Sequence, residues 1–325
     1  MNRRLLLVSL AGVVTMPRLL TAQERKTARV GFLLGGTASS PAIYIDRFTE
    51  TLRESGWTEG KNLTLEYRYA EGHYVRLPEL ARELVRRPVD VIVTEGTPPA
   101  RAAKEATSTI PIVMATTADP AGTGLVEGLA RPGGNITGVS WFFSEIVTKR
   151  LELLKEAAPT VARVGVVYNA LNPISEPALA AMESTGKTFK MRIQRLAVRA
   201  PADFDTVLGA LTRPTIDAVI VLEDPMTHSQ SQRVVDAAIR GKVLTVFGLS
   251  NFVVSGGFLS YGPDRRALWR KAALLTDKIL RGAKPADLPI EQPTQFELII
   301  NVKTAKALGL TVPPSLLLRA DQVVQ

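Results

Sequence analysis

The stretch that decides the fold reads IPIVMATTADPAGTGLVEGLARPGGNITGVSWF and spans residues 110–142. Its apolar beginning, residues 110–115, is short and contains isoleucine and valine, which is typical of a buried parallel strand. The strand ends in a polar turn at residues 116–119. Asp119 followed by Pro120 predicts the start of a helix, because aspartate caps helix N-termini and proline fits the first helical position.

A second strand follows within the same stretch. Gly133, Gly134 and Asn135 form a predicted turn into the apolar run 136–141. Ligand pockets of open α/β folds lie at the carboxyl ends of parallel strands, where helix N-termini also point. The stretch therefore predicts one half of such a pocket.

Strand-like and helix-like patterns alternate from residue 28 to the C-terminus, which is typical of doubly wound parallel sheets. The predicted strands are 29–34, 63–69, 89–94, 110–114 and 136–141, then 163–168, 191–196, 217–222, 243–247 and 296–301. ARVGF at 28–32 resembles ARVGV at 162–166, and VDVIV at 89–93 resembles IDAVI at 216–220. A repeated pattern in a chain of 325 residues favours two similar lobes over one large sheet.

A small or polar residue precedes proline near the ends of several predicted strands. Helix capping alone explains each pair, because the first residue suits an N-cap and proline suits the first turn. As a set, however, the pairs would surround a cleft between two facing lobes, and such a cleft suits a small polar or anionic ligand. The pairs are Ser40-Pro41, Thr97-Pro98, Asp119-Pro120, Asn172-Pro173, Asp224-Pro225 and Gly262-Pro263.

The composition excludes several classes of protein. Hydrophobic residues make up 46% and charged residues 22% of the chain, which is typical of a globular protein and not of a disordered one. The net charge of +9 is scattered and forms no basic stripe with aromatic residues, so nucleic acid is not an expected partner. The chain contains no cysteine, which excludes disulfides, thiolate metal sites and a lipid-modified cysteine.

The N-terminus resembles a secretory signal peptide. Asn2, Arg3 and Arg4 precede the apolar run 5–14, and Ala22 offers a small residue before a cleavage point. The apolar run is too short to span a bilayer well. We therefore expect residues 1–22 to direct the protein to the periplasm; the alternative is an uncleaved interfacial anchor.

No catalytic constellation is evident in the sequence. The histidines are His73, expected at the surface, and His228, expected to border the cleft, and neither has a carboxylate partner at metal-ligand spacing. A GxSxG nucleophile motif, a GxxxxGK[ST] phosphate loop and a full GxGxxG motif after the first strand are absent from the sequence. The sequence thus predicts no catalytic residue, no metal and no cofactor.

Seven stretches extend over nearly the whole chain beyond the N-terminal segment. They are GFLLGG, SGWTEGKNLTLEYRYAEG, DVIVTEGTPPARAAKEAT, IPIVMATTADPAGTGLVEGLARPGGNITGVS, RLELLKEAAP, VGVVYN and INVKTAKALGLTVPPSLLLRAD. Together they closely resemble the substrate-binding proteins of ABC transporters, of the tryptophan/tyrosine-binding type. The DPAGTGLVEGLARPGGNITGVS block is the most specific part of this resemblance.

The resemblance implies a type I periplasmic-binding fold. This is an α/β fold of two doubly wound, Rossmann-like lobes with parallel sheets, joined by three crossover segments. The N-terminal lobe would comprise residues 28–140 and about 261–284, and the C-terminal lobe residues 144–258 and about 291–325. The ligand would lie in the cleft, the lobes would close on it by a hinge motion, and the closed monomer would dock transiently on a permease in the inner membrane.

The same resemblance implies which residues face the ligand. A carboxylate would bind Thr97 and nearby helix N–H groups, and an acid such as Asp119, Glu223 or Asp224 would pair with an ammonium group. The complete set is Gly35, Gly36, Thr37, Thr97, Thr116, Thr117, Asp119, Ser140, Tyr168, Asn169, Glu223, Asp224, Ser250, Asn251 and Tyr261.

One turn departs from the pattern of the family. Relatives often carry an acidic pair after the strand 243–247, whereas this chain has Gly-Leu-Ser-Asn at 248–251. The ligand predicted from the sequence is therefore a small organic molecule, either an amino acid or a neutral or acidic aromatic compound. The alternatives to an ABC importer component are a periplasmic sensing module for a membrane receptor and a two-lobed α/β enzyme.

Overall fold

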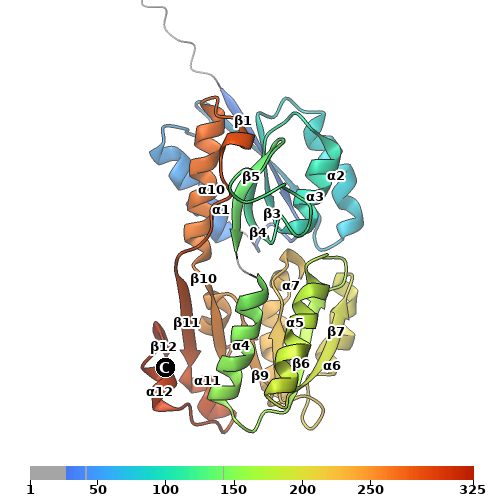
Figure 1. The fold of residues 1–325 in the computed structure, drawn as a ribbon, viewed down its shortest axis with the longest axis vertical. Coiled ribbons are helices and arrows are strands. Elements are labelled where there is room, and N and C mark those ends of the chain that lie inside the picture. Colours follow the sequence, from blue (N-terminus) through green and yellow to red (C-terminus); the bar gives the residue numbers. More distant parts are fainter. Residues whose placement is uncertain (1–26, 41, 142) are drawn as a thin grey trace, which may run out of the picture.

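The computed structural model describes residues 27–325 apart from 41 and 142. The chain forms two lobes that lie one above the other in Figure 1, each built on a sheet with helices packed against it. The predicted signal peptide, residues 1–22, lies outside the described residues.

The elements alternate as the sequence pattern predicts. The first lobe contains β1 (Ala28–Leu34), α1 (Ala42–Glu54), β2 (Leu63–Tyr69), η1 (Tyr74–Arg76), α2 (Leu77–Val85), β3 (Val91–Glu95), α3 (Thr97–Ala106), β4 (Ile112–Ala118), β5 (Ile136–Trp141), α10 (Arg265–Leu280) and η3 (Pro285–Asp287). The second lobe contains α4 (Phe143–Ala157), β6 (Arg163–Asn169), α5 (Ser175–Thr188), β7 (Arg192–Val198), η2 (Pro201–Asp203), α6 (Phe204–Gly209), β8 (Ala218–Val221), α7 (Pro225–Ser229), α8 (Ser231–Arg240), β9 (Leu244–Phe247), α9 (Ser250–Val254), β10 (Leu259–Pro263), β11 (Phe296–Asn301), α11 (Val302–Ala307), α12 (Pro314–Leu317) and β12 (Gln322–Val324).

The first sheet has the strand order β2-β1-β3-β4-β5, and all its pairs are parallel. Side chains of β1 alternate between the faces of the sheet: Val30 and Phe32 pack with residues of α1 and α10, and Leu33 packs with residues of α2 and α3. Successive strand residues point to opposite faces, so the buried apolar residues of β1 need helices on both faces of the sheet. Figure 1 shows α1 and α10 on one side of this lobe and α2 and α3 on the other.

The second sheet has the order β12-β11-β10-β9-β8-β6-β7. Its pairs are parallel except for β10 with β11. The chain leaves the second lobe through β10, forms α10 in the first lobe, and returns through β11. The two strands therefore run in opposite directions through the same sheet, as Figure 1 shows.

The chain crosses between the lobes three times. The crossings lie between β5 and α4, between β10 and α10, and between η3 and β11. The first and third crossings are joined by backbone hydrogen bonds, from Ser140 N to Glu291 O (2.8 Å) and from Glu291 N to Gly138 O (2.9 Å). These bonds join two of the three connecting segments to each other. The two segments therefore do not move as independent flexible strands.

The stretch 110–142 differs from its prediction at one point. The expected helix after Asp119 is wrong: residues 119–135 form turns and bends, and β4 extends to Ala118. Asp119 has a positive φ of 38°, and its Oδ1 accepts a hydrogen bond from Gly122 N (2.9 Å), so it caps a turn. Gly122, Gly124 and Gly128 follow closely, and glycine favours turns over helix interiors. The predicted Gly133–Gly134 turn is confirmed, with positive φ at both residues.

Candidate functional site

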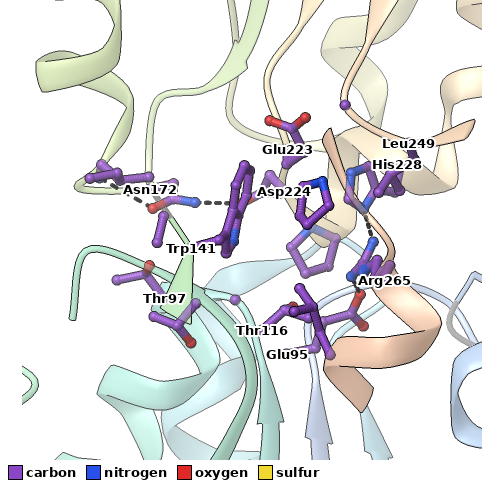
Figure 2. A pocket seen from close by; sticks show the side chains of 18 residues that line it. Glu95, Thr97, Thr116, Trp141, Asn172, Glu223, Asp224, His228, Leu249 and Arg265 are labelled. Carbon is purple, nitrogen blue, oxygen red and sulfur yellow. Dashed lines mark hydrogen bonds and ion pairs between the residues drawn. The ribbon is translucent and has the colours of Figure 1, made fainter. Parts of the chain in front are cut away.

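A cavity lies between the two lobes, at the carboxyl ends of their parallel strands. Its volume is about 40 Å³, a few times the roughly 10–15 Å³ that one water molecule needs. The first lobe contributes the ends of β3, β4 and β5 and the start of α10; the second contributes the ends of β8 and β9 and the start of α7 (Figure 2). The lining residues are Glu95, Gly96, Thr97, Thr116, Thr117, Ala118, Trp141, Asn172, Ile174, Glu223, Asp224, Pro225, His228, Gly248, Leu249, Pro263, Arg265 and Leu268.

A buried ion pair forms the charged end of the cavity. Glu95, the last residue of β3, is 2% exposed, and Arg265, the first residue of α10, is 8% exposed. The Arg265 guanidinium donates through Nη2 to Glu95 Oε1 and through Nη1 to His228 Nδ1 at 2.8 Å, as Figure 2 shows. The guanidinium carbon also lies 4.8 Å from the ring centroid of Tyr44. A cation placed over an aromatic face and bonded on two sides is firmly oriented.

Burial determines the protonation states of Glu95 and His228. Burial raises the pKa of Glu95 above its usual value, and the Arg265 cation opposes that rise. Burial lowers the pKa of His228 well below its usual value, and the cations of Arg265 and Arg150 lower it further. The imidazole is therefore neutral near pH 7, which allows Nδ1 to accept the bond from Arg265.

Four buried oxygens of the lining lack hydrogen-bond partners among the residues that the structure describes. They are Glu95 Oε2, Thr117 Oγ1 and both carboxylate oxygens of Glu223, of which Oε1 is paired with Arg150 as an ion pair. Leaving a buried polar atom unpaired costs about 1–3 kcal/mol, more for a charged one. In the first lobe, Glu95 Oε2 and Thr117 Oγ1 therefore favour a binding partner with polar hydrogens.

A second buried ion pair lies in the second lobe. The Arg150 guanidinium is completely buried, and its Nη2 lies 2.5 Å from Glu223 Oε1. Arg150 Nε donates to the carbonyl oxygen of Tyr261 at 2.8 Å. Figure 2 shows the Glu223 carboxylate directed into the second lobe. A Cβ placed on Gly248 would overlap this carboxylate, so the glycine in the unusual 248–251 turn makes room for the ion pair.

Asp224 follows Glu223 and behaves differently from the sequence expectation. It is the N-cap of α7, as its position before proline predicts. Its carboxylate accepts four hydrogen bonds: from Tyr74 OH (2.6 Å), Met226 N (2.9 Å), Asn169 Nδ2 (3.1 Å) and Asn172 Nδ2 (3.0 Å). A carboxylate offers about four acceptor sites, so little capacity is left for an ammonium group of a ligand.

Apolar side chains form the remaining wall of the cavity. Trp141, which is 8% exposed, lies at the end of β5 beside the first crossing. Figure 2 shows its indole among the side chains that line the cavity. The other apolar contributions come from Ala118, Ile174, Pro225, Leu249, Pro263 and Leu268. The cavity thus combines an aromatic and aliphatic wall with one buried charged end.

The structure places the predicted ligand-facing residues in two groups. Those that line the cavity are Thr97, Thr116, Thr117, Glu223 and Asp224. Those that lie elsewhere are Gly35, Gly36, Thr37, Asp119, Ser140, Tyr168, Asn169, Ser250, Asn251 and Tyr261. Within the second group, Asp119 is exposed and shares a neighbouring surface groove with Ser140, while Asn169 and Tyr261 hold Asp224 and Arg150. Which of them touch a ligand stays a prediction.

The N-terminus of α3 offers fewer donors than the sequence reading expected. Thr97 is the first helical residue, so Pro98 and Pro99 occupy the next two positions and have no N–H. Gly96 N donates to Thr116 O at 2.8 Å. Of the first three helical residues, Thr97 alone has a backbone N–H for a ligand carboxylate. Arg265 is therefore the stronger candidate to bind that carboxylate.

Sequence reasoning missed Glu95, Trp141 and Arg265 in the cavity. Glu95 ends a buried strand, so the strand-end rule used for Thr116 and Thr117 would have found it. For Trp141 the sequence predicts only that it lies in a strand. His228 was expected to border the cleft, and it does line the cavity.

No group of three or more histidine or acidic side chains in residues 27–325, apart from 41 and 142, is placed to hold a metal ion. Over the same residues, no helix has the length and hydrophobicity needed to cross a bilayer.

Comparisons with known proteins agree with this geometry. A sequence model of the family described as "ABC transporter substrate binding protein" matches residues 39–324. The tyrosine-binding protein of Clostridioides difficile (strain R20291) is 29% identical over 263 residues, which is 81% of this chain and 75% of that protein.

Two solved structures are similar over most of the chain. The ABC domain in complex with L-Trp from Streptococcus pneumonia has a TM-score of 0.84 at 27% identity, covering 92% of this chain and 100% of that one. The ligand-free, open structure of a substrate binding protein with adhesive properties from Clostridium difficile has a TM-score of 0.62 at 26% identity, covering 92% and 99%. These likenesses confirm the predicted α/β fold of two lobes.

Identity and coverage are nearly equal for the two structures, and the TM-score is higher for the L-Trp complex than for the ligand-free, open structure.

Proposed function

The chain belongs to the family of ABC transporter substrate-binding proteins, and on this basis we propose that it captures an aromatic amino acid between its lobes for import. Proteins of this family bind a solute and do not transform it, so the prediction that the chain is not an enzyme is confirmed by its membership. Tryptophan and tyrosine are the proposed ligands, because similar proteins are described as tyrosine-binding and as a complex with L-Trp.

The cavity between the lobes is the observation that carries the proposal. Its apolar wall, with Trp141 and Leu249, suits a flat ring, since aromatic pairs gain energy beyond the area they bury. Its charged end, with Glu95 and Arg265, suits a zwitterion. Neither a sugar nor a simple carboxylic acid would match both the apolar wall and the charged end of the cavity.

The proposed pose places each ligand group against a matching protein group. The ammonium group donates to Glu95 Oε2 and Thr117 Oγ1, which supplies the partners those buried oxygens lack among the described residues. The carboxylate accepts from Arg265 N–H groups not used by Glu95 and His228, and from Thr97. The ring lies along Trp141.

The turn at 248–251 no longer argues against an amino acid. Gly248 is required by the Glu223–Arg150 pair, and the acid that meets the ammonium comes from the first lobe as Glu95. A cavity of about 40 Å³ leaves little free space, so we propose that an amino acid enters while the lobes are apart and is enclosed when they close.

The remaining parts of the proposal come from the sequence. Residues 1–22 act as a signal peptide, the mature protein is a periplasmic monomer, and its closed form docks transiently on a permease of the inner membrane. A fusion of residues 1–22 to a reporter enzyme that is active only after export tests the first point. An inactive fusion in a strain that exports other reporters would contradict it.

Isothermal titration calorimetry tests the ligand class directly. The protein is first unfolded and refolded to remove ligand acquired in the cell, then titrated with L-Trp, L-Tyr and L-Phe. D-Trp and 3-(indol-3-yl)propanoate, which lacks the amino group, serve as matched ligand controls. We expect saturable binding of at least one L-amino acid and much weaker binding of both controls. Absence of binding for all three would reject the proposal.

A tryptophan pair makes the test specific to the cavity. Trp141→Ala removes the aromatic wall. We expect affinity to fall about tenfold or more, because stacked aromatic rings contribute free energy beyond that of burying apolar surface. Trp57→Ala removes an equally large side chain from the first lobe, where its indole N–H bonds Asp277 Oδ1 at 2.8 Å outside the cavity. That control should lose stability and keep affinity.

A further inference from the structure

The start of α7 in the second lobe fits into a glycine-lined surface of the first lobe. A Cβ on Gly36 would lie 3.0 Å from Pro225 O, and a Cβ on Gly72 would lie 3.2 Å from Met226 Cγ. A Cβ on Gly96 would lie 3.2 Å from Pro225 Cδ. Three glycines that are far apart in the sequence therefore permit one close approach between the lobes.

A hydrogen bond joins the lobes at the same place. Tyr74 OH of the first lobe donates to Asp224 Oδ1 of the second at 2.6 Å, and both side chains are buried. Met226 N, which bonds the same carboxylate oxygen, lies 3.3 Å from the tyrosine oxygen. Met226 is fully buried and belongs to one apolar cluster with Tyr74 and Leu33 of the first lobe. This contact connects protein to protein and does not pass through a ligand.

Asp224 is held mainly by its own lobe. Three of its four hydrogen bonds come from its own lobe, from Asn169, Asn172 and Met226 N. Burial and the neighbouring carboxylate raise the pKa of Tyr74 well above its usual value, so the hydroxyl keeps its proton. A fixed acceptor facing a protonated donor reduces the entropy lost when the bond forms.

We propose that Tyr74 is a positioning residue whose bond to Asp224 latches the two lobes together and slows ligand release. Opening the lobes would break a buried charge-assisted bond and withdraw Pro225 and Met226 from the glycine-lined surface. The latch therefore acts on the closed state, and its main kinetic effect falls on dissociation. The predicted effect on ligand release rests on the proposed function, whereas the predicted effect on closure of the lobes does not.

Distance measurements between the lobes test closure without reference to a ligand. The chain has no cysteine, so Glu79→Cys and Glu176→Cys, on the exposed starts of α2 and α5, accept two spin labels without competing sites. In the refolded protein, Tyr74→Phe should lengthen the mean distance between the labels. Tyr67→Phe removes a half-buried hydroxyl from β2 of the same lobe and should leave that distance unchanged.

A glycine pair gives an independent variant. The φ of Gly36 is not in the left-handed region, so Gly36→Ala is tolerated within its lobe and meets Pro225 O only when the lobes are closed. It should lengthen the distance between the labels as Tyr74→Phe does. Gly209→Ala, in α6, has open space around it and is the control. Thermal unfolding of all four variants checks that each is folded.

Stopped-flow fluorescence with L-Trp tests release. We expect Tyr74→Phe to raise the dissociation rate constant about tenfold while the association rate constant changes little, in line with the loss of one charge-assisted hydrogen bond. Equal distances and equal dissociation rates in Tyr74→Phe and Tyr67→Phe would overturn the latch. If no aromatic amino acid binds the unmodified protein, the proposed function fails, and the distance measurements still decide whether the latch exists.

Discussion

The two lobes contain equivalent buried ion pairs with different roles. Glu95 ends β3 and Glu223 follows β8, and these two strands occupy the same position in their sheets beside β1 and β6. Each pairs with an arginine on the helix that comes directly after a crossing between the lobes: Arg265 at the start of α10, and Arg150 in α4. The two lobes therefore share a buried glutamate–arginine pair as well as a topology.

The surroundings of the two pairs decide what each one does. Glu223 and Arg150 lie beneath Gly248 and are held by the Tyr261 carbonyl, inside the second lobe. Glu95 and Arg265 both line the cavity, whereas of the second pair only Glu223 does, and its carboxylate is directed into its own lobe. Glu95 Oε2 and Glu223 Oε2 both lack a hydrogen-bond partner among the described residues. The comparison teaches that the same pair of charges stabilises a lobe when its arginine and carboxylate are directed into that lobe, and can recognise a ligand when both partners face the cavity.

Removing the enclosed arginine should have the largest effect. Arg150→Met leaves the Glu223 carboxylate buried without its cation, and breaking a buried pair in this way costs about 3–5 kcal/mol of unfolding free energy. Urea unfolding followed by circular dichroism measures the change. Arg195→Met breaks exposed pairs with Glu176 and Glu183 and should cost about 1 kcal/mol or less. Similar losses in the two variants would contradict the assigned difference.

Neutralising the open pair should mainly change binding. Glu95→Gln keeps an acceptor for Arg265 and removes the charge that meets the ligand ammonium, so we expect affinity for L-Trp to fall about 10- to 100-fold. Glu223→Gln, the matched change in the other lobe, should reduce stability and leave affinity within about threefold, because the Glu223 carboxylate points into its own lobe. Isothermal titration calorimetry of both variants with L-Trp measures the two changes in affinity. Equal affinity losses would remove the distinction between the pairs.

Acid should weaken binding through Glu95. Burial raises the pKa of Glu95 above its ordinary value of 4.5, so the carboxylate becomes neutral at a higher pH than an exposed glutamate does. The ammonium partner is therefore lost as the pH falls through this raised pKa, and affinity for L-Trp should be complete near neutral pH and decline in mildly acidic buffer. In Glu95→Gln this decline should disappear. An unchanged decline in that variant would assign the effect to another group.

The smallest effect is expected at Asp119, which follows β4, the strand beside β3. It is exposed, lies outside the cavity and caps a turn through Gly122 N, so Asp119→Ala should cost about 0.5–1 kcal/mol of stability. Affinity for L-Trp should not change. A clear loss of affinity at unchanged stability would show that this strand end reaches the ligand after all.

Much of the fold could be predicted because its signals are local. The bounds of β2, β5 and β11 agree with the strands predicted from the sequence at 63–69, 136–141 and 296–301. The likeness between the two ARVG segments also has a structural counterpart: Arg29 N donates to Asp90 Oδ2 and Arg163 N to Asp217 Oδ2, each at 2.8 Å. The helix after Asp119 was predicted wrongly because a capping signal was given more weight than the glycines that follow it.

The candidate site was less predictable. Thr116 and Thr117 were found because polar residues at a strand end follow a general rule. Arg265 was missed because its partner Glu95 is 170 residues away, and no local pattern relates the two. Asp224 was recognised as a cap, and its further bond to Tyr74 could not be inferred from the residues beside it.

The sequence by itself determined the alternation of strands and helices, the two similar lobes and the edge of each sheet at which a ligand would bind, because periodicity, capping and turn chemistry act within a few residues. The tertiary structure alone decided which acids are enclosed, which is open to the cavity and which joins the lobes. Those roles depend on partners 150 and 170 residues apart and on the burial that removes water from around each charge.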